Sequence, residues 1–270
     1  NPVNSIIVND DIIIKAKNGK EATDVMNRIV TPDCVTFGVI VPDGVTEIKE
    51  GAFKTCSYMT SEVVPDSVNM IRAGAFEVCS DLESIEFGKG VTIICDDAFY
   101  NCSGLKSLVI PDNVVRVGYE VFKGCSGLES VTIGKGITSI ENWVFYGCSG
   151  LKSIVIPGNV AEIRHAAFYG CSGLTAVIIE NGVTYIGDYA FGECRKLPFI
   201  VIPESVTRIG EYAFDCCDKL EHIIYQGTRE QWRKIRKEYD NVEFTFIGWF
   251  CGCTQLMSRQ TFRQHANFTS

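Results

Sequence analysis

Residues 105–125 read L-K-S-L-V-I-P-D-N-V-V-R-V-G-Y-E-V-F-K-G-C, and the same residue types return along the chain at steps of 23 residues. Eight phenylalanines keep this step without insertion or deletion: Phe53, Phe76, Phe99, Phe122, Phe145, Phe168, Phe191 and Phe214. Eight cysteines do the same: Cys56, Cys79, Cys102, Cys125, Cys148, Cys171, Cys194 and Cys217. A fixed period of roughly 20–50 residues is typical of a solenoid, in which each repeat packs on its neighbours. The sequence therefore predicts a stacked coil without a single central core.

Each copy contains a predicted strand, a turn and a predicted short helical turn, the last at 120–124 in the copy above. Side chains two residues apart in a strand share a face, so alternate strand residues point inward. The inward residues predicted for this copy are Leu108, Ile110, Val114, Val117, Phe122 and Cys125. We expect the phenylalanines and cysteines of successive copies to lie directly above one another inside the coil.

A glycine follows the Cys-Ser pair in four copies: Gly104, Gly127, Gly150 and Gly173. Glycine at the end of a helical turn fits a left-handed backbone conformation, and we predict that conformation for these four residues.

Glu62 interrupts the inward row, because it falls where other copies place an aliphatic residue such as Ile85 or Leu108. Burying a lone carboxylate is costly. We therefore expect the strand near Glu62 to be distorted, or its side chain to turn to solvent.

The strand pattern L-x-x-L-x-L, with the continuation I-P-x-x-V-x-x-I-x-x-x-A-F-x-x-C, resembles the BspA-like (Treponema pallidum-type) leucine-rich repeats. The resemblance implies an α/β repeat solenoid: a right-handed coil with one parallel β-sheet, short helical turns on the opposite side and atypical N- and C-terminal caps. It also implies a bacterial extracellular or cell-surface setting, because members are often surface or secreted proteins that bind other proteins or host matrix.

The register of the repeat divides the chain into three parts. Residues 1–35 are expected to form an N-terminal cap, a hairpin followed by a short helix at 21–30. Residues 36–227 are the leucine-rich-repeat array. Residues 228–270 are expected to form a C-terminal cap with a helix, a strand and a polar tail. In that cap Thr228 and Gln231 match a capping box, and Trp232 is expected to cover the last coil.

Charge and hydropathy argue against two classes of partner. The chain has a formal net charge of −8 and a pI near 5.0, which argues against a nucleic-acid surface. Its apolar runs fall short of the roughly 18 residues that a transmembrane helix needs. We therefore predict no nucleic acid as a partner and no membrane span in this chain.

The chain has 13 cysteines, of which eight keep the period. Free cysteine behaves as a small buried apolar residue, so we predict an internal ladder of reduced thiols. A disulfide between adjacent coils is the alternative, because strand spacing alone does not exclude it. The other five are Cys34, Cys95, Cys216, Cys251 and Cys253.

Residue types that support catalysis or metal binding do not cluster in this sequence. His165 falls on the back of its coil, His222 on the sheet face and His265 in the tail. Cys251 and Cys253 are metal-ligand types, but a structural zinc site usually needs four ligands. We therefore expect no catalytic residue, no metal and no cofactor.

The sheet face offers the best binding hypothesis. Its outward row is aliphatic in seven of nine copies: Ile40, Val63, Glu86, Val109, Thr132, Val155, Ile178, Val201 and Ile224. A large exposed apolar patch often marks an interaction site; the alternative is that β-branched residues simply favour strands. The predicted partner-binding residues are Val109, Val155, Ile178, Phe199, Val201, His222 and Ile224.

Charges alternate between successive copies at two positions. One set lies on the strand: Glu83, Lys106, Glu129 and Lys152. The other lies in the turn: Asp66, Lys89, Asp112 and Lys135. We predict ladders of alternating charge that hold the coils in register, each cross-strand pair being worth about 0.2–1 kcal/mol.

Three functional hypotheses follow. The first is a non-enzymatic interaction or adhesion module, which binds a protein or glycan partner through the sheet face and could also self-associate there. The second is a structural spacer or stalk within a larger surface protein. The third, an enzyme, is disfavoured because the sequence shows no cluster of acid, base and nucleophile.

Overall fold

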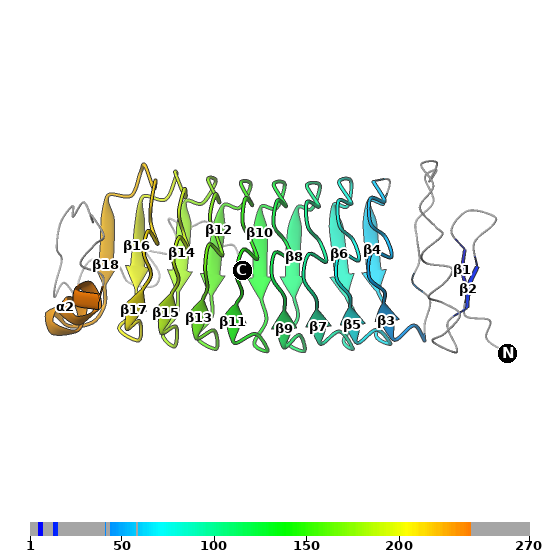
Figure 1. Ribbon diagram of the computed structural model, residues 1–270, viewed down its shortest axis with the longest axis horizontal. Helices are drawn as coiled ribbons and strands as arrows, with labels where there is room; N and C mark the ends of the chain where they lie inside the picture. Colours follow the sequence, from blue (N-terminus) through cyan, green and yellow to red (C-terminus); the bar gives the residue numbers. More distant parts are fainter. Residues whose placement is uncertain (1–4, 8–12, 16–40, 42–43, 58, 239–270) are drawn as a thin grey trace.

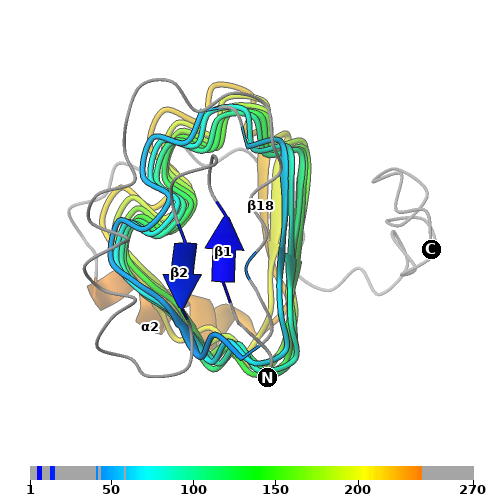
Figure 2. The same cartoon turned by 90° about the vertical axis from the view of Figure 1, so that its right-hand side faces the viewer.

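The computed structural model describes residues 5–7, 13–15, 41, 44–57 and 59–238, and its array is a parallel β-solenoid of about eight turns (Figure 1). Viewed along the axis of the solenoid, successive coils superimpose and enclose one continuous interior (Figure 2). Each coil carries a four-residue strand on one side and a two-residue strand on another, with tight turns between them. The fold class predicted from the repeat is confirmed.

The four-residue strands form the long-strand face. They are β4 (Ser61–Val64), β6 (Ser84–Phe87), β8 (Ser107–Ile110), β10 (Ser130–Ile133), β12 (Ser153–Ile156), β14 (Ala176–Ile179), β16 (Phe199–Ile202) and β18 (His222–Tyr225). Six of them pair in parallel from β8 to β18, and β4 pairs with β6. The register moves by one repeat per strand, so Leu108 in β8 pairs with Val131 in β10.

A second row of strands is an addition to the predicted single sheet. These two-residue strands are β3 (Glu47–Ile48), β5 (Met70–Ile71), β7 (Ile93–Ile94), β9 (Arg116–Val117), β11 (Ser139–Ile140), β13 (Glu162–Ile163), β15 (Tyr185–Ile186) and β17 (Arg208–Ile209). They form two four-stranded parallel sheets. A strand this short has no alternation long enough to recognise in sequence.

The predicted helical turns are tight turns in the structure. In the coil of Phe122, the Lys123 N–H donates to the Glu120 carbonyl at 3.0 Å, and the Cys125 N–H donates to the Phe122 carbonyl at 3.2 Å. Such three-residue spacing gives turns too short to continue as a helix. Within the described part of the chain, the one helix is α2 (Arg229–Glu238).

The repeated phenylalanines form a continuous stack through the interior. From Phe53 to Phe214, successive rings lie between 4.9 and 5.9 Å apart, centroid to centroid, and nearly parallel. Offset stacking of this kind adds about 0.5–1.5 kcal/mol per pair beyond the area that each ring buries. The stack confirms that each repeat wraps once around the coil.

The repeated cysteines form the predicted ladder beside the phenylalanines, as thiols and not as disulfides. From Cys79 to Cys217, each thiol donates to the carbonyl of a phenylalanine in the preceding coil, as Cys125 Sγ does to Phe99 O at 3.2 Å and Cys148 Sγ to Phe122 O at 3.2 Å. These carbonyls also accept a backbone N–H from their own coil, as Phe99 O does from Cys102 N at 3.2 Å, so each ladder thiol adds a second hydrogen bond.

The prediction for the glycines after the Cys-Ser pair was wrong. The left-handed glycines near the cysteines instead precede them, at Gly124, Gly147 and Gly170. At Gly127, a Cβ atom would lie 2.3 Å from the Ser103 carbonyl oxygen of the preceding coil, and Gly150 is similarly close to Ser126. These glycines are needed because the backbones of adjacent coils approach too closely for a side chain.

The prediction for Glu62 was also wrong. Glu62 stays in β4, in register with Ile85, and its side chain is only 3% exposed. One carboxyl oxygen accepts a hydrogen bond from the Val41 N–H at 3.4 Å, and the other has no hydrogen-bond partner within the part of the chain that the structure describes. The backbone pairing of β4 holds this residue inward. Burial raises the pKa of Glu62 from 4.5 to about 8, and the Val41 N–H lowers it in part.

Helix α2 closes the C-terminal end of the array. The Gln231 N–H donates to Thr228 Oγ1 at 3.1 Å, and the Thr228 N–H donates to Gln231 Oε1 at 2.6 Å, which confirms the capping box. Trp232 is 5% exposed and lies 5.2 Å from the ring of Tyr225, centroid to centroid. The indole thus extends the core beyond the last long strand.

The N-terminal segment is described only in part. β1 (Ser5–Ile7) pairs antiparallel with β2 (Ile13–Lys15), as a hairpin requires. The helix predicted at 21–30 and the strand and tail predicted after residue 238 lie outside the described residues.

Candidate interaction surface

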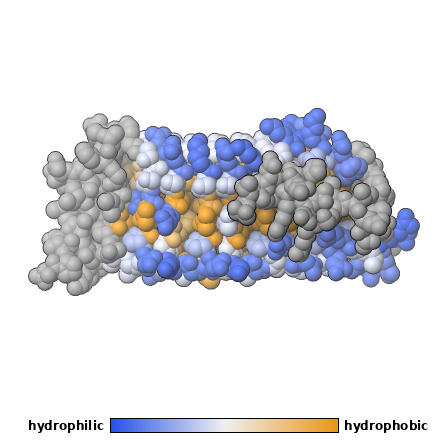
Figure 3. Space-filling view, turned by 180° about the vertical axis from the view of Figure 1, so that it is seen from behind, coloured by the Kyte–Doolittle hydropathy of each residue, from blue (hydrophilic) through white to orange (hydrophobic). Residues whose placement is uncertain are grey.

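A row of apolar side chains runs along the long-strand face. In Figure 3, which shows this face, apolar residues form a band with polar residues on both sides. The strand register places the members of the row side by side, because Val155 pairs with Ile178, Ile178 with Val201, and Val201 with Ile224. We call this set, together with Val63 and Val109, the apolar row.

The exposure of the apolar row varies along the array. Val63 and Val109 are 62% and 59% exposed and Ile224 is 37% exposed, whereas Val155, Ile178 and Val201 are half-buried. Polar residues interrupt the row at Glu86 and Thr132, which pair with Val63 and Val109. The row is therefore continuous from β12 to β18 and broken nearer the N-terminus.

The remaining two predicted site residues lie beside the C-terminal end of the row. Phe199 begins β16 and pairs with His222, which begins β18. Both are half-buried. The fold thus brings Val155, Ile178, Val201, Phe199, His222 and Ile224 onto one patch, with Val109 two strands further along the same face.

Charged residues border the apolar row. Of the predicted strand ladder, one ion pair forms across neighbouring coils, between Lys152 Nζ and Glu129 Oε2. Among the ion pairs of the described residues, Lys106 has none with Glu83 or Glu129. The turn ladder is held differently: the Asp66 carboxylate accepts the Lys89 N–H at 2.7 Å, and the Asp112 carboxylate accepts the Lys135 N–H at 2.8 Å. The aspartates therefore fix the coil register through backbone hydrogen bonds.

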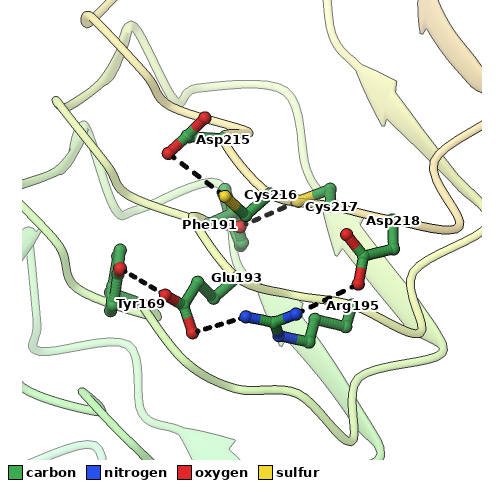
Figure 4. A network of polar contacts seen from close by, with 8 residues as sticks. All are labelled: Tyr169, Phe191, Glu193, Arg195, Asp215, Cys216, Cys217 and Asp218. Atoms are coloured by element: carbon green, nitrogen blue, oxygen red, sulfur yellow. Dashed lines mark hydrogen bonds and ion pairs between the residues drawn. The ribbon is translucent and has the colours of Figure 1, made fainter.

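A polar network joins the last coils of the array (Figure 4). The Tyr169 hydroxyl donates to Glu193 Oε1 at 2.7 Å, and Arg195 bridges Glu193 Oε2 at 3.3 Å and Asp218 Oδ2 at 3.2 Å. The hydrogen bond to Glu193 raises the pKa of Tyr169 to about 12. Arg195 thus pairs with two carboxylates of opposite charge, and these contacts hold the last coils together.

The network also holds the one cysteine that is exposed among the described residues. Cys216 Sγ donates to the carboxylate of Asp215 at 3.5 Å, and this hydrogen bond raises the pKa of the thiol. A catalytic cysteine needs a lowered pKa, because the thiolate is the nucleophile. Cys216 therefore lacks the activation that nucleophilic catalysis requires.

Within the described residues, no group of three or more His, Cys, Asp and Glu side chains is placed to hold a metal ion. His165 lies at the edge of Trp143, 5.3 Å away, and His222 lies on the opposite, long-strand face. Cys251 and Cys253 lie outside the described residues.

Comparison with known proteins identifies the repeat. The model of the BspA type leucine rich repeat region matches residues 33–151 and 116–234. The chain belongs to the BspA type leucine rich repeat family. Proteins of this family generally take part in protein interactions or are surface-associated, and leucine-rich-repeat proteins are typically non-enzymatic. No curated protein matches the chain.

Solved structures agree with the family assignment. The Treponema pallidum leucine rich repeat protein TpLRR is 29% identical, with a TM-score of 0.55, over 63% of this chain and 86% of that one. A leucine-rich repeat protein from Bacteroides ovatus is 26% identical, with a TM-score of 0.54, over 83% and 70% of the two chains. The pneumococcal vaccine antigen PcpA, at 18% identity and a TM-score of 0.51 over 83% and 71%, shares the fold.

This BspA type array also carries an aromatic cluster that the sequence reasoning missed. On the turns after the short strands, ring contacts link six side chains: Trp143, Tyr146, His165, Tyr169, Tyr189 and Tyr212. We call this cluster the aromatic ridge. Its signal in the sequence is the one-period spacing of Tyr146 from Tyr169 and of Tyr189 from Tyr212.

No helix within the described part of this BspA type chain is long and apolar enough to cross a membrane.

Proposed function

We propose that this chain is a non-enzymatic interaction or adhesion module, secreted or displayed on a bacterial surface, that binds a protein or glycan partner through the long-strand face. The observation that carries the proposal is the apolar row from β12 to β18. Four aliphatic side chains there meet in strand register on one face of the array. Family membership supports the surface setting.

The mechanism is the display of side chains at a fixed spacing. The phenylalanine stack and the cysteine ladder hold the coils rigidly, and strand pairing sets the distance between one outward residue and the next. A partner that adds to this face gains from burying Val155, Ile178 and Val201, at roughly 25 cal/mol per Å² of apolar surface. Phe199 supplies an aromatic anchor beside them, of the kind that is enriched at binding hot spots.

The test replaces three central residues of the apolar row with charged residues of alternating sign. In the variant Val155→Lys, Ile178→Glu and Val201→Lys, opposite charges pair across strands, so the coils retain a favourable register. We expect a loss of binding to immobilised host extracellular matrix or bacterial envelope, and of any self-association measured by analytical ultracentrifugation. Circular dichroism checks that the fold survives.

Val115→Glu is the matched control, because Val115 is 59% exposed but lies beside the short strand β9, away from the apolar row. If the triple variant folds and binds as the wild type does, the row is only scaffold and the chain is better described as a spacer or stalk. If both variants lose binding equally, the partner does not use the long-strand face.

A further inference from the structure

The aromatic ridge lies on a different side of the coil from the apolar row and has a different chemistry. Tyr189 and Tyr212 stack at 5.0 Å, centroid to centroid, and Tyr189 also contacts Tyr169 and His165 edge-on at 6.2 and 5.9 Å. Tyr212 is 46% exposed. Since the next position of the repeat falls on helix α2, Tyr212 is the last aromatic residue at its repeat position.

Carboxylates surround the C-terminal end of the ridge. Asp188 and Glu211 precede Tyr189 and Tyr212 directly in the chain, and Asp215 follows three residues after Tyr212. Partial burial raises the pKa of Tyr189, and Tyr212 and these three carboxylates raise it further. Among the described residues, none of the three forms an ion pair, although Asp188 accepts the Glu211 N–H at 2.8 Å.

The array already places cations against tyrosines elsewhere. Lys123 Nζ lies 5.6 Å from the ring centroid of Tyr100 and 5.3 Å from that of Tyr146, at the N-terminal end of the ridge. The Arg208 guanidinium lies 3.9 Å from the ring centroid of Tyr185 on the short-strand side. An ammonium or guanidinium group is attracted to the face of an aromatic ring, most strongly where carboxylates add to the negative potential.

We propose that the C-terminal end of the aromatic ridge, around Tyr189 and Tyr212, binds the arginine or lysine side chains of a basic segment in a partner protein. The exposed ring of Tyr212, with Tyr189 stacked behind it, provides the aromatic face. Asp188, Glu211 and Asp215 provide the charge opposite to that of the bound side chain. A net charge of −8 on the whole chain steers such a segment toward the surface. This site acts independently of the apolar row, so the array has two faces for partners of different chemistry.

The test titrates a capped peptide of alternating arginine and glycine into the full chain, by fluorescence polarisation at low and at physiological ionic strength. A second peptide carries citrulline in place of arginine, because citrulline keeps the shape and loses the charge. We expect the arginine peptide to bind, the citrulline peptide to bind at least about tenfold more weakly, and salt to weaken the binding.

Two double variants locate the site. Tyr189→Gly with Tyr212→Gly removes both rings, and the left-handed backbone at these residues, with φ of 55° and 56°, accepts glycine without strain. We expect about a tenfold loss of affinity for the arginine peptide. Glu211→Gln with Asp215→Asn keeps the rings, and we expect a loss of about fivefold with a smaller dependence on salt. Thermal melts check that both variants fold.

The charge-matched control is Glu204→Gln with Glu221→Gln, which removes the same charge at exposed sites outside the ridge. If this control weakens binding as much as the Glu211 and Asp215 variant does, the peptide responds only to overall charge and the site is refuted. Unchanged binding in the double tyrosine variant, or no binding of the arginine peptide to wild type, also refutes it. Tighter binding of a neutral oligosaccharide, lost in the tyrosine variant, would assign the ridge to a glycan.

Discussion

At the scale of single residues, Glu62 shows how a solenoid holds a group that its surroundings disfavour. The side chain lies at an inward position of β4 beside Ile85, and one carboxyl oxygen has no hydrogen-bond partner among the described residues. A pKa of about 8 means that the folded protein holds this carboxyl protonated at neutral pH. A neutral acid costs far less to bury than a carboxylate, which explains why the strand is not distorted.

Glu62 should make the stability of the array depend on pH. Because its folded pKa of about 8 lies above the ordinary value of 4.5, the unfolded chain loses this proton first as pH rises. The stabilising contribution of Glu62 is therefore complete below pH 4.5 and is lost between pH 4.5 and 8, by up to about 1.4 kcal/mol per pH unit. Urea denaturation at several pH values measures this slope.

Glu62→Ile is the variant that isolates the effect, since other coils hold an aliphatic residue at this position. We expect it to be more stable than wild type at neutral pH, and to lose the part of the pH slope that Glu62 contributes. An identical slope in the wild type and the variant would show that the carboxyl reaches solvent or gains a partner in solution.

At the scale of elements, each side of the coil is formed by its own type of element. Long strands carry the apolar row, short strands pair with one another on another side of the coil, and tight turns place the phenylalanines in the interior. The ends need a different element, because a terminal coil exposes core edge. Helix α2 supplies it at the C-terminus, with Trp232 and Ile235 buried and Arg233 and Lys234 exposed on the same helix.

Trp232→Ala should therefore destabilise the last coils. Truncating a buried tryptophan typically costs about 3–5 kcal/mol, from lost burial and from the cavity left behind. We expect a lower urea midpoint, and faster proteolysis at the C-terminal end of the array. Arg233→Ala on the exposed face of the same helix should change stability by less than about 0.5 kcal/mol; equal effects of the two changes would mean that α2 does not cap the core.

At the scale of the whole molecule, the interior is a single ladder that no reagent can reach without opening coils. Six consecutive ladder thiols are fully buried: Cys79, Cys102, Cys125, Cys148, Cys171 and Cys194. Burial also raises the pKa of thiols such as Cys125 and Cys148, which keeps them in the unreactive protonated form.

Native alkylation followed by peptide mapping should therefore label Cys216 and spare these six thiols. Denaturant should expose all of them, because the array must unstack to admit the reagent. Raising the pH should speed the labelling of Cys216, whose hydrogen bond to Asp215 raises its pKa, while the six remain protected. Labelling of Cys125 or Cys148 at the rate of Cys216 would contradict a continuous closed interior.

The sequence by itself determined which residues share a position in the coil. A strict period of 23 residues was enough to predict the phenylalanine stack, the cysteine ladder, the inward strand residues and the row Val155, Ile178, Val201 and Ile224. These four features follow from the period alone, because stacked coils place residues that are one period apart above one another.

Only the tertiary structure decided the features that depend on backbone angles and on distances between coils. Gly127 and Gly150 are glycine because neighbouring backbones come too close, and Glu62 stays inside because strand pairing leaves it no other direction. The aromatic ridge draws its rings from three different repeat positions, so it exists only once the turns fold them together. Periodicity aligns residues of one position, whereas packing between positions is a property of the folded coil.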